Sequence, residues 1–186
     1  MYEDYEHKEV GRRAVAREFC DWIEAVMIAV IFAVLVFAFV VRLAGVDGAS
    51  MRPTLEHRDR LLISRLGGEF RQGEIVVVIM PDHTSEMLVK RVIAIGGQTV
   101  YIDFDAGIVF VDGYALYEPY INETTRLRSD VTFPVTVPDG HVFVLGDNRN
   151  NSRDSRDSHI GMVDTRYILG RAFYRLFPYE RMGVPR

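Results

Sequence analysis

The feature that most constrains the fold is a run of 17 residues, Ala25 to Val41, that carries no charged or strongly polar side chain. As an α-helix rising ~1.5 Å per residue, this run is about 25 Å long. Apolar neighbours extend it over residues 22–46, close to the ~30 Å hydrocarbon core of a bilayer. A buried core helix of this kind needs a much larger protein to cover every face. The sequence therefore predicts a transmembrane anchor over residues 22–46.

The anchor is predicted to stay uncleaved. It follows 24 residues of which seven are acidic, whereas a secretory signal begins with a short basic segment. Four basic residues precede the span and four follow it closely, so the positive-inside rule gives a tie and leaves the orientation open. Residues 1–21 form a polar N-terminal segment, and residues 47–186 have the length of a single globular domain.

Charge, cysteine and histidine content argue against several classes. The formal net charge of −4 argues against a nucleic-acid binder, which usually has a basic excess. The single cysteine, Cys20, cannot form an intrachain disulfide. The scattered histidines show no metal-ligand spacing; they are His7, His57, His83, His141 and His159. We therefore expect no metal, no cofactor and no nucleic-acid partner.

From about Arg60 onward, short β-branched runs alternate with Gly, Pro, Asp and Asn. Asp105-Ala106-Gly107 and Asp112-Gly113 are typical hairpin turns. The expected strands lie within residues 60–66, 73–80, 86–95, 98–103, 107–113, 133–137, 141–146 and 167–178. The pattern predicts a mostly β domain of short-stranded antiparallel sheets, twisted or barrel-like, without a long amphipathic helix.

Ser50 follows the apolar run closely, in the stretch "GASMRPTL". Pro53 fixes its own φ and biases Arg52 away from helix, so a defined turn follows the serine. Gly48 leaves room for another group to approach. Taken alone, the stretch is either a polar exit turn from the membrane or the site of a reactive serine.

Lys90 lies in the middle of a predicted strand, "EMLVKRVIAI". Leu88, Val92 and Ala94 are expected to share its face, and the other face is also largely apolar. Most lysines in strands extend to solvent. An apolar environment disfavours the charged form of a lysine and lowers its pKa, which suits a general base.

A polar loop, "LGDNRNNSRDSRDSHIG", follows the predicted strand at 141–146. It combines carboxylates, guanidinium groups and hydroxyls within ten positions: Asp147, Asn148, Arg149, Ser152, Asp154, Ser155 and Arg156. The loop is either an ordinary surface loop or a stiff ion-pair network near a functional site. It lacks the ligand spacing of a calcium loop. The spacing also leaves open a Ser-His-Asp triad that uses His159 and Asp157.

Three ordered motifs, "SMRPTL", "LVKRVIAIGG" and "GDNRNNSRDSR", resemble the boxes of bacterial type I signal peptidases, also called leader peptidases. "EIVVV" and "VDGYALYEPYI" resemble two further segments of that family. The likeness extends from the anchor to about Pro178. Members of the family remove signal peptides from exported preproteins, and the spacing resembles that of the short, single-span members.

The resemblance implies a serine endopeptidase with a Ser-Lys dyad, in which Ser50 is the nucleophile, Lys90 the general base and Ser152 orients the lysine amine. Ser50, Gly48 and Met51 would line the oxyanion and substrate-binding site. Gly48 stands where some members carry a serine, so the oxyanion hole would rely more on backbone N–H groups. The residues implied to brace the site are Asp147, Asn148, Arg149, Asp154 and Arg156.

The resemblance also implies the setting and the substrate. A preprotein would bind as an extended strand beside a sheet edge, with small residues in an Ala-X-Ala pattern before the cleaved bond. The N-terminus would be cytoplasmic and the β domain extracytoplasmic, on a single-pass protein of the plasma membrane. Gln98 departs from the acid that the family often shows at that position. The sequence does not indicate an oligomeric state.

Three other interpretations are open. A Ser-His protease of the type found in eukaryotic signal peptidase complexes would have a histidine at position 90, where this chain has a lysine. The self-cleaving repressors share a Ser-Lys dyad but begin with a DNA-binding domain. From a different class, the chain could be a non-catalytic, membrane-tethered binding module of the same fold.

Overall fold

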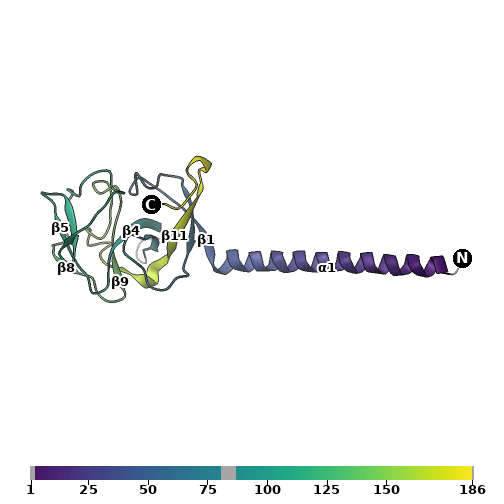
Figure 1. Cartoon of the computed structure of the whole chain (residues 1–186). Helices are drawn as coiled ribbons and strands as arrows, with labels where there is room; N and C mark the ends of the chain where they lie inside the picture. Colours follow the sequence, from purple (N-terminus) through teal and green to yellow (C-terminus); the bar gives the residue numbers. More distant parts are fainter. Residues whose placement is uncertain (1–2, 81–86, 186) are drawn as a thin grey trace. The chain divides into compact units, whose positions relative to one another are not determined.

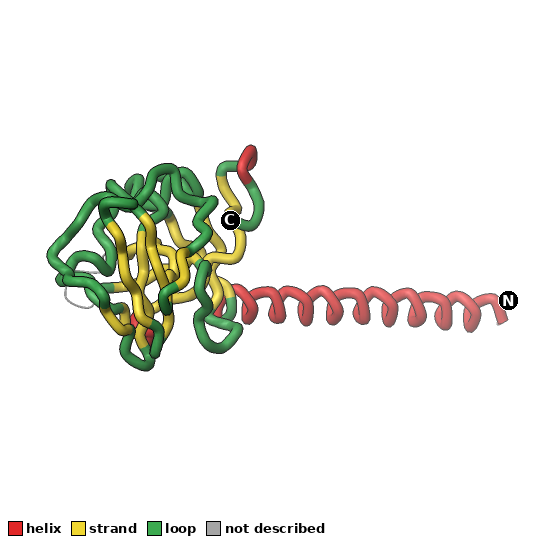
Figure 2. Tube along the Cα trace, turned by 60° about the vertical axis from the view of Figure 1, so that its left-hand side comes forward, coloured by secondary structure: helices red, strands yellow, loops and turns green. Residues whose placement is uncertain are grey.

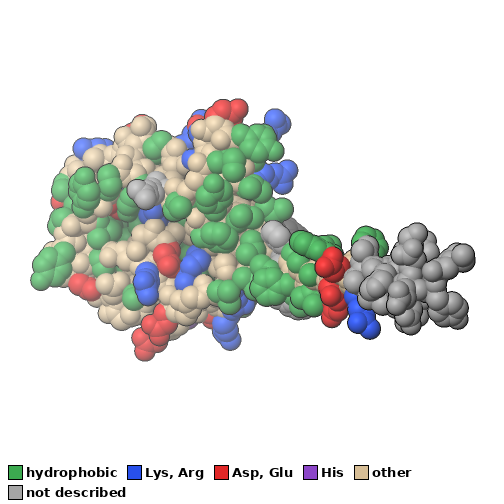
Figure 3. Space-filling view, turned by 45° about the vertical axis from the view of Figure 1, so that its right-hand side comes forward, with side chains coloured by type: hydrophobic (Ala, Val, Ile, Leu, Met, Phe, Trp, Pro, Cys, Tyr) green, Lys and Arg blue, Asp and Glu red, His purple; other side chains and the backbone are tan. Residues whose placement is uncertain are grey.

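The computed structural model describes residues 3–80 and 87–185. The chain divides into two compact units, residues 1–40 and 41–186. The first unit is one helix, α1 (Glu3–Phe39) (Figure 1). Within it, Arg17–Val36 has a mean hydropathy of 2.3 and no buried residue, and by length and composition it can cross a membrane. Hydrophobic side chains cover much of the visible face of this segment, and charged side chains lie toward its N-terminal end (Figure 3). The predicted N-terminal apolar helix is therefore confirmed.

The end of the predicted anchor is corrected by the structure. The helix ends at Phe39, and Val41–Gly45, which the sequence assigned to the anchor, forms strand β1. β1 pairs antiparallel with β2 (Arg60–Ser64) over its whole length. Hydropathy did not separate β1 from the helix, because its one charged residue, Arg42, could equally lie at the edge of a membrane span. At the other end, α1 runs through most of residues 1–21, the predicted N-terminal segment.

The second unit is built of eleven short strands, all paired antiparallel, and two short 3-10 helices among the residues that the structure describes. After β1 and β2, the elements are β3 (Ile75–Ile79), β4 (Met87–Ile95), β5 (Thr99–Asp103), β6 (Ile108–Val111), β7 (Tyr114–Ala115), β8 (Val135–Thr136), β9 (His141–Leu145), β10 (Val163–Asp164), η1 (Thr165–Tyr167), β11 (Ile168–Phe177) and η2 (Tyr179–Arg181). The prediction of short-stranded antiparallel sheets is confirmed.

The strands form two sheets. The larger has seven strands in the order β1-β2-β11-β3-β4-β9-β10, and the smaller has four in the order β7-β6-β5-β8. β5 and β8 of the smaller sheet lie at the far end of this unit from β1 (Figure 1). Strands occupy the centre of the unit and loops surround them (Figure 2). β4 is therefore an interior strand, with neighbours on both edges.

Both predicted hairpin turns are present. Residues 104–107 join β5 to β6, and Asp112-Gly113 joins β6 to β7 with positive φ at both positions (51° and 81°). This pair of angles is that of a type I′ turn, whose twist matches the twist of the flanking strands. At 112–113 the turn residues thus decided the local structure.

The alternation of side chains along β3 explains how the large sheet is covered. Val77 belongs to an apolar cluster on one face, with Met51 and Leu55, whereas Val76 and Val78 belong to a cluster on the other face. The first four residues of β3 are all buried. A third cluster joins the end of β4 to the smaller sheet. A charged side chain placed in the middle of β4 therefore has little access to water.

Candidate active site

Ser50 and Lys90 are in direct contact. Lys90 Nζ donates a hydrogen bond to Ser50 Oγ at 2.8 Å. Lys90 is 3% exposed, and the residues that flank it on the same face of β4, Leu88 and Val92, pack in one apolar cluster. Lys90 therefore does not extend to solvent. The predicted alternation holds around it and breaks at a register shift between Val92 and Ala94.

Ser50 lies in a compact turn between β1 and β2. The Arg52 N–H donates to the Ala49 carbonyl at 3.2 Å, and the Leu55 N–H donates to the Met51 carbonyl at 2.9 Å. The side chains of Met51 and Leu55 are buried in the core beneath β1 and β2. These two apolar side chains therefore hold the turn in the core on both sides of Arg52-Pro53. It is an ordered part of the domain and not a loose exit from the helix.

The loop after β9 holds the backbone of this turn. The Asn148 N–H donates to the Ser50 carbonyl at 2.9 Å, and Asn148 Nδ2 donates to the Ala49 carbonyl at 3.0 Å. Gly146, two positions before Asn148, also lies against the backbone of this turn. A Cβ on Gly146 would come 2.5 Å from the Ser50 carbonyl oxygen and would also overlap Ser152 Oγ. Only glycine permits this close approach of the two segments.

Asp147 joins the segments that carry Ser50 and Lys90. It is fully buried, and Arg91 Nε and Nη2 donate to its two oxygens at 2.8 and 2.7 Å. Thr54 Oγ1, from the turn of Ser50, donates to the same carboxylate. A buried carboxylate is tolerated when its charge is paired and its oxygens are hydrogen-bonded. Because Arg91 directly follows Lys90, this carboxylate fixes β4 and the turn against each other.

Arg149 forms a second buried ion pair. Its Nη1 and Nη2 donate to the two oxygens of Glu118 at 2.8 and 2.5 Å, and its Nε donates to the Gly146 carbonyl at 3.1 Å. Tyr120 Oη donates to Glu118 at 2.9 Å. Burial, and next the charge of Glu118, raise the pKa of Tyr120 above its ordinary value. Its hydroxyl therefore stays protonated as a hydrogen-bond donor.

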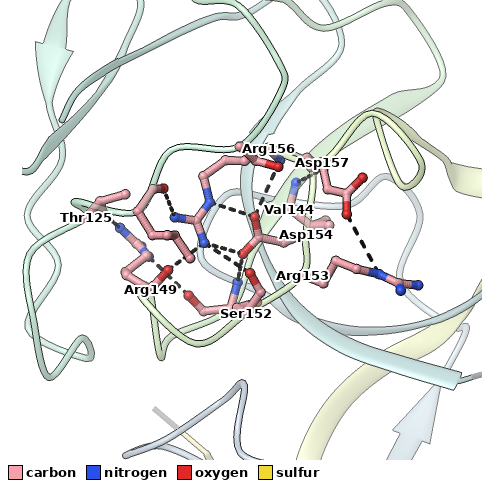
Figure 4. Close-up of polar contacts among 12 residues, drawn as sticks. Thr125, Val144, Arg149, Ser152, Arg153, Asp154, Arg156 and Asp157 are labelled. Atoms are coloured by element: carbon pink, nitrogen blue, oxygen red, sulfur yellow. Dashed lines mark hydrogen bonds and ion pairs between the residues drawn. The ribbon is translucent and has the colours of Figure 1, made fainter.

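Asp154 and Arg156 complete the loop. Arg156 Nε and Nη2 donate to the two Asp154 oxygens at 2.8 and 2.9 Å, and the Gly146 N–H donates to Asp154 at 3.0 Å. Arg156 Nη2 also donates to the Arg149 carbonyl at 2.6 Å. Figure 4 shows the Arg156 guanidinium between Asp154 and the main chain of the same loop. The loop is thus an ion-pair network and not an ordinary surface loop.

Ser152 differs from its expected role. Its Oγ is buried and makes no hydrogen bond with any residue that the structure describes. It packs against Gly146. The hydrogen bond to the lysine amine that the family resemblance implies is therefore not formed with the described atoms. That role of Ser152 stays a prediction.

The histidines do not enter the contact at Ser50 as far as the chain is described. His159 Nδ1 pairs with Asp157 at 2.9 Å and is 74% exposed in its side chain, whereas the Ser50 hydroxyl meets Lys90. The carboxylate of Asp157 and the imidazole of His159 lie within 4.8 Å of an oxygen of Asp130, and the three residues form a group at the surface. The structure therefore favours a Ser-Lys arrangement over the Ser-His-Asp alternative. His83 lies outside the described residues.

At the corner after β4, Gln98 makes two hydrogen bonds, one with the main chain and one with a carboxylate. Its Oε1 accepts from the Ile95 N–H at 3.0 Å, and its Nε2 donates to Asp112 at 3.1 Å. The departure from the family pattern at this position thus leaves the turn well connected.

Sequence reasoning missed five residues of the site, which are Thr54, Arg91, Glu118, Tyr120 and Gly146. A usable signal existed for one of them. An arginine in the middle of an otherwise apolar strand is rarely buried without a partner, so Arg91 predicts a buried acid nearby. The other four depend on contacts between distant segments, which a single sequence does not reveal.

The chain is similar to known proteins over most of its length. The profile of the family described as "Signal peptidase, peptidase S26" matches residues 19–177. The chain is 39% identical over 172 residues to "Probable signal peptidase I-1" of a Synechocystis strain, covering 87% of this chain and 84% of that protein. It is 36% identical over 172 residues to "Signal peptidase I" of Bacillus licheniformis, covering 87% and 90%. A crystal structure of a signal peptidase I from Enterococcus faecalis aligns with a TM-score of 0.44 at 27% identity, covering 56% of this chain and 97% of that one.

Proposed function

The chain belongs to the signal peptidase I family (peptidase S26), a family of serine endopeptidases, and from this premise we propose that it removes signal peptides from exported preproteins with Ser50 as nucleophile and Lys90 as general base. The observation that carries the proposal is the 2.8 Å contact between Lys90 Nζ and Ser50 Oγ, made by a lysine that is 3% exposed. Burial disfavours the ammonium form and makes the neutral amine available as a base.

The proposed chemistry is acyl transfer in two steps. Neutral Lys90 takes the proton of Ser50 Oγ as this oxygen attacks the carbonyl carbon of the peptide bond. The resulting Lys90 ammonium gives the proton to the leaving amine as the carbon–nitrogen bond breaks, which leaves an ester on Ser50. A water molecule, deprotonated by Lys90, then hydrolyses the ester and returns both side chains to their starting state.

The oxyanion is proposed to bind at the backbone of the turn. The Ser50 N–H donates to no acceptor among the described residues, so it is available to a developing negative charge. The Gly48 N–H already donates to His57 Nδ1 at 3.3 Å. Gly48 therefore contributes open space, because a Cβ there would meet nothing within 4 Å. Met51 contributes only backbone, since its side chain is buried.

The substrate is proposed to be an extended segment with small residues in an Ala-X-Ala pattern before the cleaved bond, bound beside a sheet edge. The protein is proposed to be a single-pass protein of the plasma membrane, with residues 1–21 in the cytoplasm and the β unit outside. The short connection supports this placement. Ser50 follows the last residue of α1, Phe39, by 11 positions, which keeps it close to the membrane surface where a signal peptide emerges.

Cleavage of a preprotein-derived peptide containing Ala-X-Ala, by the full chain in detergent micelles, tests the proposal. We expect the wild type to cut after the second Ala, as read by product mass, and Ser50→Ala to lose cleavage. Ser129→Ala, at an exposed serine, is the matched control and should cleave like the wild type. Cleavage by Ser50→Ala at the wild-type rate would overturn the assignment. Binding without cleavage by the wild type would favour the non-catalytic binding module.

A further inference from the structure

We propose that Tyr120 is a positioning residue for the Ser50–Lys90 pair, because its ring covers the buried Arg91–Asp147 ion pair that holds the turn of Ser50. The inference rests on the proposed function, since it concerns the same site. It assigns a role to the segment between β7 and β8, which contributes no atom to the Ser50–Lys90 contact itself.

The primary observation is the contact of Tyr120 with Arg91. The Arg91 Cζ lies 3.9 Å from the centroid of the Tyr120 ring. Arg91 is 4% exposed and Asp147 is fully buried. A guanidinium over an aromatic face is attracted by the ring, and the attraction is stronger where water is excluded. The ring therefore both stabilises the Arg91 guanidinium and covers one side of the ion pair.

The ring is itself fixed at its far end. Tyr120 Oη donates to Glu118 at 2.9 Å, and Glu118 is held by both Nη atoms of Arg149. The Arg149 Cζ lies 6.0 Å from the centroid of the same ring. Tyr120 is thus placed between two guanidinium groups, each of which belongs to one of the ion pairs around Gly146.

The connection to the reacting residues passes through one carboxylate. Asp147 accepts from Arg91 on one side and from Thr54 Oγ1 on the other. Thr54 lies in the turn of Ser50. If the ring is removed, water competes for the Asp147 oxygens and the bond to Thr54 loosens. The distance between Ser50 and Lys90 then varies, and misplacement by ~1 Å can reduce a rate by about 10²-fold.

Tyr117 provides a matched control. It lies three residues before Tyr120 in the same segment and is 89% exposed. The two residues have the same side chain and lie close together in the chain, but only Tyr120 has a described contact with a guanidinium group. Substitution of Tyr117 therefore tests the segment without disturbing the ion pair.

The first experiment compares peptide cleavage by Tyr120→Leu, Tyr120→Phe and Tyr117→Leu, each corrected for the folded fraction. We expect Tyr120→Leu to lower kcat ~10-fold or more, with KM within about twofold of the wild type, because the turn is displaced while the sheet edge proposed to bind the substrate remains. Tyr120→Phe keeps the ring and should restore kcat to within about threefold. Tyr117→Leu should match the wild type. An unchanged kcat in Tyr120→Leu would overturn the proposal.

The second experiment asks whether the effect passes through Asp147. Thr54→Val removes the hydroxyl that joins the turn to this carboxylate. If Tyr120 acts along this route, Thr54→Val and Tyr120→Leu together should lower kcat by little more than the larger single effect. Effects that multiply would contradict the route.

A third measurement does not depend on activity. Amide hydrogen exchange of residues 47–55 should be faster in Tyr120→Leu and in Thr54→Val than in the wild type and in Tyr117→Leu. If the wild type fails to cleave any peptide, the proposed function fails, and exchange still decides the role of Tyr120. If Tyr120→Leu unfolds, Tyr120→Met, with a longer and more flexible side chain of similar volume, takes its place. Unchanged exchange at 47–55 would overturn the proposal.

Discussion

A Cβ on Gly146 would come 2.5 Å from the Ser50 carbonyl oxygen, whereas a Cβ on Gly48, two positions before the same serine, would meet nothing within 4 Å. Gly146 belongs to a loop of buried ion pairs, and Gly48 to the exposed start of the turn. The two regions therefore have different effects on Ser50. The crowded loop fixes the backbone of Ser50, the proposed nucleophile, and the open side leaves space in which we propose that the substrate binds.

The crowded side also explains why so many charges are buried. Asp147 and Asp154 each accept two donors from one guanidinium, and both ion pairs adjoin Gly146. Buried ion pairs of this kind contribute little net stability compared with apolar side chains, but they are very sensitive to the loss of one partner. They therefore specify one arrangement of the turn and the loop.

The largest effect is expected at the contact that the two regions hold together. Lys90→Met keeps an unbranched side chain among the apolar neighbours of Lys90 but removes the base. We expect peptide cleavage to fall by at least ~10³-fold at every pH, since general base catalysis contributes about 10² to 10⁴ and no other base is placed at Ser50 Oγ in the described structure. Thermal unfolding should change little, which separates loss of chemistry from loss of fold.

The pH dependence of the wild type follows from the same role. The amine must be neutral to accept the Ser50 proton, so cleavage should fall as the pH decreases through the pKa of Lys90 and the ammonium form accumulates. The rate constant is compared between about pH 5, where a lysine with an ordinary pKa is protonated, and about pH 10, which is close to that ordinary pKa. A rate constant that does not change over this range would contradict Lys90 as the base.

The next largest effect is expected on stability, at the carboxylate of the crowded loop. Asp147→Asn leaves the buried Arg91 guanidinium without a charged partner. Breaking a buried pair in this way should lower the free energy of unfolding by about 3–5 kcal/mol, as measured by urea denaturation of the full chain. Asp139→Asn, at an exposed carboxylate, should change it by less than about 0.5 kcal/mol.

Gly146→Ala tests the crowding directly. The added methyl would overlap the Ser50 carbonyl and Ser152 Oγ, so the turn and the loop must move apart. We expect a loss of about 1–3 kcal/mol in the free energy of unfolding. The decrease in kcat should exceed that of Gly48→Ala, because the displaced atoms belong to the nucleophile itself. An alanine that is neutral for both quantities would contradict the close packing.

The smallest effect is expected on the open side. Gly48 has a φ of +86°, which disfavours a Cβ even where there is space for one. Gly48→Ala should lower the free energy of unfolding by about 1 kcal/mol. Gly48→Asn should lower it less, because asparagine tolerates positive φ better than alanine does. Equal losses in the two variants would show that contact, and not the backbone angle, decides this position.

Local signals predicted most of the fold. The strand of Lys90 was correct because a short apolar, β-branched run favours a strand, and the turn at 112–113 because Asp-Gly favours positive φ. The helix ends before the predicted end of the anchor, since Val41–Gly45 has only one charged residue, Arg42, and forms a strand by pairing with β2. Two-residue strands such as β7 and β10 are too short to leave a periodic signal.

The candidate site was predicted less completely. Ser50 and Lys90 could be named because the three motifs resemble one family, and the alternating Asp and Arg of the loop indicated ion pairs. The need for glycine at 146 and the placement of Tyr120 over Arg91 could not be predicted. Both depend on the approach of segments far apart in the chain, which is a property of packing and not of local pattern.

The change from helix to strand has a consequence for how the protein meets its substrates. Only Val40 separates α1 from β1, and 11 positions separate Phe39 from Ser50. Fully extended, such a stretch spans at most about 40 Å, and here part of it is folded into β1. If α1 spans the bilayer, as we propose, so short a tether keeps the serine in a thin layer above the membrane. Encounters with a substrate anchored in the same membrane then depend on molecules per unit area. On this proposal, a soluble peptide should be a much poorer substrate than the same sequence attached to an apolar helix.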